Sequence, residues 1–120
     1  MDKTGNIINL LELGARAEGL RQRTIATNIA NMETPKYRRQ DIQFEELLNE
    51  ALSSDKPLQE KDLNEMIYTP ENSPVKENGN DVSLEHEVGQ MIKNSIRHKT
   101  FMRVLSKKYQ QMALAMDTRG

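Results

Sequence analysis

A long run of apolar side chains at helical spacing in the C-terminal third of the chain most constrains how it folds. From Leu84 to Met116 the run advances in alternating steps of four and three residues, and its only polar members are Ser95 and His98. Its members are Leu84, Val88, Met91, Ser95, His98, Met102, Leu105, Tyr109, Met112 and Met116. This spacing is typical of a helix with a coiled-coil seam. It predicts a helix of ~50 Å over residues 84–116, with Ser83 as its N-cap.

The N-terminal segment, from about Asn6 to Asn31, also has helical periodicity. Asn6 suits an N-cap, and Pro35 disfavours helix in the residue before it, so the helix should end there. The apolar side chains form two adjacent stripes, which are Leu10, Leu13, Ala17 and Leu20, and Ile7, Leu11, Ile25 and Ile29. We therefore expect a mainly α protein whose two long terminal helices pack as a coiled-coil-like hairpin, either parallel or antiparallel.

The chain between the two long helices changes character twice. A basic turn, residues 36–39, leads to a short amphipathic helix over 42–52 with Asp41 as its cap. Residues 53–80 contain three of the four prolines, and their isolated apolar residues predict a flexible or extended arm. The expected divisions are 1–34 for the N-terminal helix, 35–52 for the turn and short helix, 53–80 for the arm, and 81–120 for the C-terminal helix.

The composition argues against an enzyme. Only 36% of the 120 residues are hydrophobic and mean hydropathy is -0.77, which leaves few large side chains for a deep core. The chain has no cysteine, and neither His86 nor His98 has a second ligand at the spacing of a helical metal pair. Glycine-rich phosphate-binding motifs are absent. We expect no catalytic site, cofactor, metal or small-molecule substrate.

The sequence also shows no pattern typical of a membrane-spanning helix or of a secretory signal. No apolar run approaches the ~20 residues that span a bilayer. The first residues do not combine a basic segment with an apolar one, so we expect no cleaved secretory signal.

Charge is distributed unevenly along the chain. Residues 1–40 carry seven basic and four acidic groups, residues 41–90 carry three and thirteen, and residues 91–120 carry seven and one. Basic ends and an acidic middle predict electrostatic contact between them, within one chain or between copies. The acidic middle argues against a nucleic-acid partner.

The two helices hold more apolar surface than one hairpin can cover, because Ile92 and Ile96 lie well off the seam. Monomers seldom leave such a surface bare, so we expect it to contact other chains. The candidate assembly residues are Leu10, Leu13, Leu20, Ile25, Ile29, Met91, Ile92, Ile96, Phe101, Met102, Leu105, Tyr109 and Met112. A rival interpretation is a soluble helical adaptor or chaperone that binds a client helix.

Residues 25–39, IATNIANMETPKYRR, resemble the signature of the flagellar rod, hook and hook-filament junction proteins. Residues 41–48, 78–85 and 101–109 are similar to rod members of that family. The motif residues are Asn28, Ala30, Asn31, Thr34, Pro35 and Tyr37. The family usually has glycine where this chain has Lys36, and glycine suits a turn with positive φ.

The resemblance implies a structural subunit of the proximal rod in the bacterial flagellar basal body. Such a subunit assembles with copies of itself and other rod proteins to transmit torque and to form the export tube. Its implied neighbours include the rod-base adaptor FliE and the MS-ring protein FliF. The resemblance further implies export by the flagellar type III apparatus without a cleaved signal, and a place in the periplasmic part of the basal body.

Overall fold

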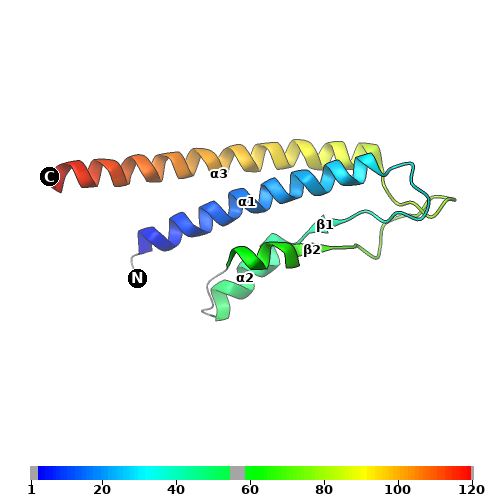
Figure 1. The fold of residues 1–120 in the computed structure, drawn as a ribbon, viewed down its shortest axis with the longest axis horizontal. Helices are drawn as coiled ribbons and strands as arrows, with labels where there is room; N and C mark the ends of the chain where they lie inside the picture. The colour runs from blue at the N-terminus through cyan, green and yellow to red at the C-terminus, as the bar shows by residue number, and fades with distance from the viewer. Residues whose placement is uncertain (1–2, 55–58, 120) are drawn as a thin grey trace.

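Two long antiparallel helices and a shorter arm make up the protein. The computed structural model describes residues 3–54 and 59–119, so the parts of the expected segments at 1–2, 55–58 and 120 lie outside the described residues. The molecule measures 66 × 29 × 17 Å. Figure 1 shows α3 and α1 side by side, both termini at one end, and the arm on the side of α1 that faces away from α3.

The long helices are α1, Lys3–Ala30, and α3, Leu84–Arg119. The expected mainly α hairpin is confirmed, and its helices are antiparallel. The prediction that Asn6 caps the first helix was wrong, because α1 begins three residues earlier and contains Asn6. At α3 the backbone amide of His86 donates to Ser83 Oγ at 3.4 Å, and Glu85 and Glu87 occupy the first turn, where carboxylates favour the helix dipole.

The arm consists of β1 (Asp41–Ile42), α2 (Phe44–Ser54), the 3-10 helix η1 (Glu60–Met66) and β2 (Ile67–Tyr68). β1 and β2 pair antiparallel, with Ile42 opposite Ile67. The prediction that a helix starts at residue 42 under an Asp41 cap was wrong. Pairing with β2 holds residues 41–42 extended, and the helix starts two residues later. The otherwise irregular middle contains η1 and β2, which the sequence pattern did not indicate.

The apolar core lies between α1 and the arm rather than between the two long helices. One side of α1 meets β1, α2 and η1, and the buried core residues are Leu13, Ala17, Ile42, Phe44, Leu63 and Met66. Leu20, Leu47, Leu48 and Ile67 pack around them. Folding of the arm onto α1 therefore builds this apolar core.

The α1–α3 interface is tighter and more polar than a coiled-coil seam. Gly14 of α1 lets the Phe101 ring approach so closely that an added Cβ would overlap the ring. Asn94 of α3 is buried and donates through Nδ2 to the backbone carbonyl and the carboxylate of Glu18, at 2.6 and 3.0 Å. These contacts fix the antiparallel register.

The seam expected on α3 does not coincide with its buried side. Among the side chains of α3 that the structure describes, the buried ones are Glu87, Asn94 and Leu105, of which only Leu105 belongs to the predicted run. Several of the run's apolar members are exposed instead, namely Leu84, Val88, Met102, Tyr109, Met112 and Met116. The buried polar side chains Glu87 and Asn94 find their partners on α1 and on the loop after it, so the side of α3 that is turned toward α1 is not the predicted seam.

Candidate assembly site

Asn28 joins the three segments that meet at the hairpin tip. Its Nδ2 donates to the carbonyl of Gln40 at 2.9 Å and to Glu87 Oε2 at 3.2 Å. Its Oδ1 accepts from the Tyr37 hydroxyl and from the backbone amide of Gln40, both at 2.9 Å. A completely buried amide with four partners ties α1, the following loop and α3 together.

A buried ion pair lies beside Asn28. Arg39 Nε donates to Glu87 Oε1 at 2.8 Å, and a more exposed carboxylate, Asp41, lies 3.4 Å from the same guanidinium. Burial alone lowers the pKa of Arg39, but the hydrogen bond and charge of Glu87, with a smaller contribution from Asp41, raise it above its ordinary value. Arg39 therefore stays charged although it is buried.

The loop before α3 is fastened to the same tip through Asp81. One carboxylate oxygen of Asp81 accepts from the backbone amide of Arg39, and the other accepts from Arg38 Nε at 3.1 Å.

Tyr37 at the same tip has a raised pKa. Burial is the largest cause, and the negative charges of Glu87 and Asp81 add to it, so the pKa of the phenol lies above its ordinary 10.0. Tyr37 is thus held in its neutral, hydrogen-bond-donating form.

Asn80 holds the turn that follows α1. Its Nδ2 donates to the carbonyls of Asn31 and Thr34, at 2.8 and 2.7 Å, while its Oδ1 accepts from the amide of Val82 at 2.8 Å. Both carbonyls lie in the turn after α1 and also accept from backbone amides of that turn, those of Thr34 and Tyr37, so Asn80 ties the turn to the loop before α3.

Lys36 occupies a backbone conformation that glycine favours. Its φ is 65°, and it is the third residue of a turn in which the amide of Tyr37 donates to the carbonyl of Thr34 at 3.3 Å. The amide of Lys36 donates to the carbonyl of Asn78 at 2.9 Å, which places Gly79 against it. Neighbouring loop contacts therefore hold a strained turn in place despite the lysine side chain.

Two apolar grooves flank the α1–α3 contact. One, of about 600 Å³, lies between the helices toward the chain termini and is lined by Ala15, Met102, Leu105 and Tyr109 among others. The other, of about 400 Å³, lies where α1, α2 and α3 meet, with Leu11, Phe44, Leu48, Ile96 and Val104 among its lining residues. Both have room for side chains from another molecule.

No protein-family model matches the chain. Among known proteins, it is 37% identical over 105 residues to the flagellar basal body rod protein FlgB of Agrobacterium fabrum, covering 73% of this chain and 78% of that protein. The chain belongs to the FlgB family. FlgB of Bacillus subtilis is 27% identical over 118 residues, with 91% of both chains covered. FlgB of Borreliella burgdorferi is 33% identical over 97 residues, with 66% of this chain and 72% of that protein covered.

Membership of the FlgB family confirms the assignment made from the motif and the function it implied. The protein is a structural subunit of the flagellar basal-body rod and not an enzyme. Within residues 3–54 and 59–119, no helix is long and apolar enough to cross a bilayer. In the same residues, no three side chains of the kinds that hold metals come together.

The motif residues of this FlgB-family chain surround the hairpin tip. Asn28 is buried, Asn31 and Tyr37 are half-buried, and Ala30, Thr34 and Pro35 are exposed. The Thr34 hydroxyl donates to Asn31 Oδ1 at 3.1 Å. The polar members of the motif thus shape the end of α1 and the turn after it.

The predicted assembly residues fall into three groups. Leu13, Ile25 and Leu105 are buried within the subunit. Leu10, Leu20, Ile29, Met91 and Phe101 are half-buried. Ile92, Ile96, Met102, Tyr109 and Met112 are exposed, and Ile92 and Ile96 are open over 58% and 61% of their surface. Only the last group presents a large apolar surface to another molecule.

Sequence reasoning did not single out the buried polar residues Arg39, Glu87 and Asn94 as site residues. The spacing of Glu87 and Asn94 carried a usable signal, because polar residues seven apart in an apolar helix lie on one face. Arg39 gave no such signal, since the contacts that bury it come from α3, far along the chain.

Proposed function

We propose that an outward apolar stripe of α3, which contains Ile92 and Ile96, is the surface through which this rod subunit packs against neighbouring subunits. The observation that carries the proposal is the exposure of Ile92 and Ile96 on a helix that its own hairpin partner covers on one side only. Burying the remaining surface of an isoleucine stabilises a contact by roughly 1–2 kcal/mol. Many copies stacked side by side would cover a stripe that a single copy leaves in water.

The half-buried Phe101 and the exposed Ile96, Met102 and Tyr109 extend this surface into the two grooves. Phe101 and Ile96 line the groove between the three helices, and Met102 and Tyr109 line the groove near the termini. Apolar grooves beside an apolar stripe suit the ridges of a second helix. We expect the buried Leu13, Ile25 and Leu105 to act through folding of the subunit and not through direct contact.

The proposed neighbours are copies of this chain, the other rod proteins, the adaptor FliE and the ring protein FliF. The proposed location is the periplasmic part of the basal body, reached through the flagellar type III apparatus. The small apolar core and the polar interface between the two long helices support this route, because such a subunit can unfold for passage at a low cost in free energy. The absence of cysteine avoids cross-linking in an oxidising compartment.

Ile96→Asp tests the assembly surface, with Ile96→Leu as the matched control. Position 96 is largely open to water in the subunit, so both variants should fold with the helical content of the parent. Basal bodies isolated from cells should contain the leucine variant and lack the aspartate variant, because a buried, unpaired carboxylate is costly. Normal incorporation of Ile96→Asp would overturn the proposal.

Pairwise binding assays test the proposed neighbours separately. Purified FliE and the periplasmic part of FliF should each be captured by the immobilised chain, and Ile96→Asp should reduce capture of any neighbour that covers the stripe. A neighbour that binds neither the parent nor the leucine variant is removed from the set.

A further inference from the structure

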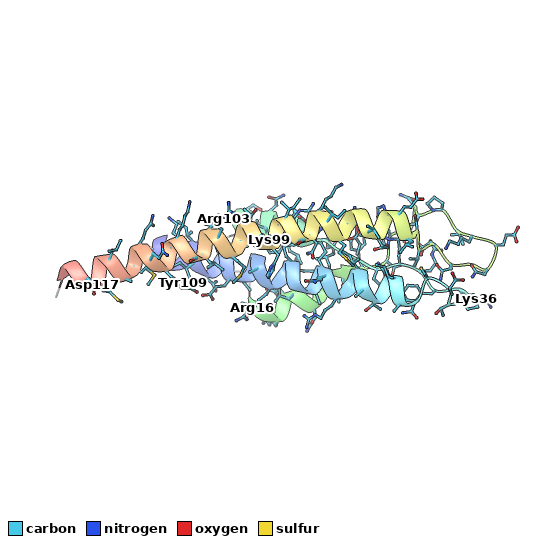
Figure 2. The ribbon with its side chains drawn as sticks, turned by 90° about the horizontal axis from the view of Figure 1, so that it is seen from above. Arg16, Lys36, Lys99, Arg103, Tyr109 and Asp117 are labelled. Carbon is cyan, nitrogen blue, oxygen red and sulfur yellow. The ribbon has the colours of Figure 1, made fainter. Side chains whose placement is uncertain are left out.

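The outward side of α3 carries a row of cations. Glu87 and Leu105 mark the side of the helix that is turned toward the rest of the subunit, and both are buried. At about 100° per residue, Lys99, Arg103 and Lys107 lie on the opposite side. All three are exposed. Figure 2, which views the molecule from the α3 side, shows Lys99 and Arg103 on this helix.

Nothing on α3 itself balances this row. The helix contains no aspartate or glutamate between Val88 and Met116. Like charges four residues apart, as at Lys99, Arg103 and Lys107, destabilise a helix. The row also lies too far from the end of α3 at Arg119 to gain from the helix dipole, which acts within the last turn. A helix that keeps an unfavourable row of cations gains from an acidic surface outside itself.

An acidic surface of matching size lies on α2. This helix carries Glu45, Glu46 and Glu50 and no basic residue, and all three glutamates are exposed. Glu45 makes an ion pair with Arg21 at 3.2 Å. Glu46 and Glu50 are four residues apart, which is the spacing of the cations on α3, so the two rows have the same pitch of ~6 Å.

The two rows make no ion pair with each other among the described residues. Where α2 approaches α3, the groove is lined on α3 by Ile96, Arg97, Thr100, Phe101 and Val104 and by none of the three cations, which lie on the outward side of the helix. We propose that the row Lys99, Arg103 and Lys107 docks on the acidic face of α2 in a second copy of this chain. Because the two surfaces differ, each copy offers both, and the contact continues from copy to copy as an open series.

This inference rests on the proposed rod function and adds a register to it. Ile92 and Ile96 precede the cations on the outward side of the same helix. Charge pairing would therefore fix the position of the neighbouring copy along α3 when that copy covers the apolar stripe. Charged pairs across an interface serve specificity in this way more than affinity. An anionic membrane is the other surface a basic row can bind, but the complementary row on the chain itself favours a second copy.

A charge exchange tests the contact. Lys99→Glu with Arg103→Glu should reduce incorporation into basal bodies about tenfold, as should Glu46→Lys with Glu50→Lys, since each sets like charges against one another. The four changes together should restore incorporation, because the pairing is then reversed but complete. Lys61→Glu with Lys76→Glu, an equal change of charge on exposed residues outside α2 and α3, is the control and should leave incorporation unchanged.

The outcomes that overturn the proposal are distinct. If the fourfold variant assembles no better than its parents, or if reversing the α3 cations has no effect, the two rows are not partners. If reversing the cations only removes binding to vesicles of phosphatidylglycerol, the row binds lipid. The proposed function stands in these cases so long as Ile96→Asp still blocks assembly, so the two ideas fail separately.

Discussion

Replacing Glu87 by alanine isolates the contribution of the buried pair at the hairpin tip. Its carboxylate is completely buried and accepts from Arg39 at 2.8 Å and from Asn28 at 3.2 Å. Without it, the buried guanidinium keeps only the 3.4 Å contact to Asp41. Removing one partner of a buried pair costs about 3–5 kcal/mol, because the other charge stays buried without its partner. Domains of this size have about 5–15 kcal/mol in total, so the loss should be a large share.

Urea unfolding of the purified chain, followed by far-ultraviolet circular dichroism, measures this loss. Glu85→Ala is the matched control, because Glu85 is an exposed carboxylate in the same first turn. It should lose less than about 1 kcal/mol, which is its interaction with the helix dipole. Equal losses for the two variants would refute the reasoning.

A double-mutant cycle separates the pair from its surroundings. Arg39→Met and Glu87→Leu should each be strongly destabilising, while the combined variant should be far more stable than the sum of the two losses predicts. Additive losses would show that the two side chains act independently.

Three further predictions concern the backbone and the hydrogen bonds of the subunit. Lys36→Gly should raise the free energy of unfolding by about 0.5–1 kcal/mol in the same urea assay, because relief at a φ of 65° exceeds the added chain entropy. Gly14→Ala should lower it by about 1–2 kcal/mol, since the new methyl group meets the Phe101 ring, whereas Gly19→Ala, with nothing within 4 Å, should raise it by up to about 1 kcal/mol. Tyr37→Phe should cost about 1 kcal/mol at neutral pH through the lost hydrogen bond. The pKa of Tyr37 is raised only in the folded state, so its stability contribution is intact below pH 10.0 and declines as pH rises through the folded-state pKa. Titration of unfolding at alkaline pH should therefore show a smaller decline in the phenylalanine variant.

The helices could be predicted from sequence because apolar spacing reports them directly. The face that α3 turns toward α1 could not, since the seam residues and the buried residues differ. Apolar periodicity assumes that apolar side chains take the buried positions. In α3 the buried positions at Glu87 and Asn94 are polar, and their partners lie on α1 and on the loop after it.

The arm was harder to predict because its structure depends on contacts between distant segments. Asp41 reads as a helix cap in isolation, but pairing of residues 41–42 with residues 67–68 makes it part of a strand. The candidate assembly residues show the same limit. Ile96 and Leu105 are equally apolar in the sequence, and only packing of the hairpin leaves one exposed and the other buried.

Single-cysteine labelling tests most directly whether assembly covers the outer side of α3. The chain has no cysteine of its own, so Ile96→Cys provides one thiol at a position that is 61% exposed in the subunit. Leu105→Cys is the control, because its site is buried in the subunit and should be protected in every state. The account predicts that the thiol at position 96 reacts readily in the free chain and is protected in isolated basal bodies. Equal reactivity of that thiol in the two states would contradict it.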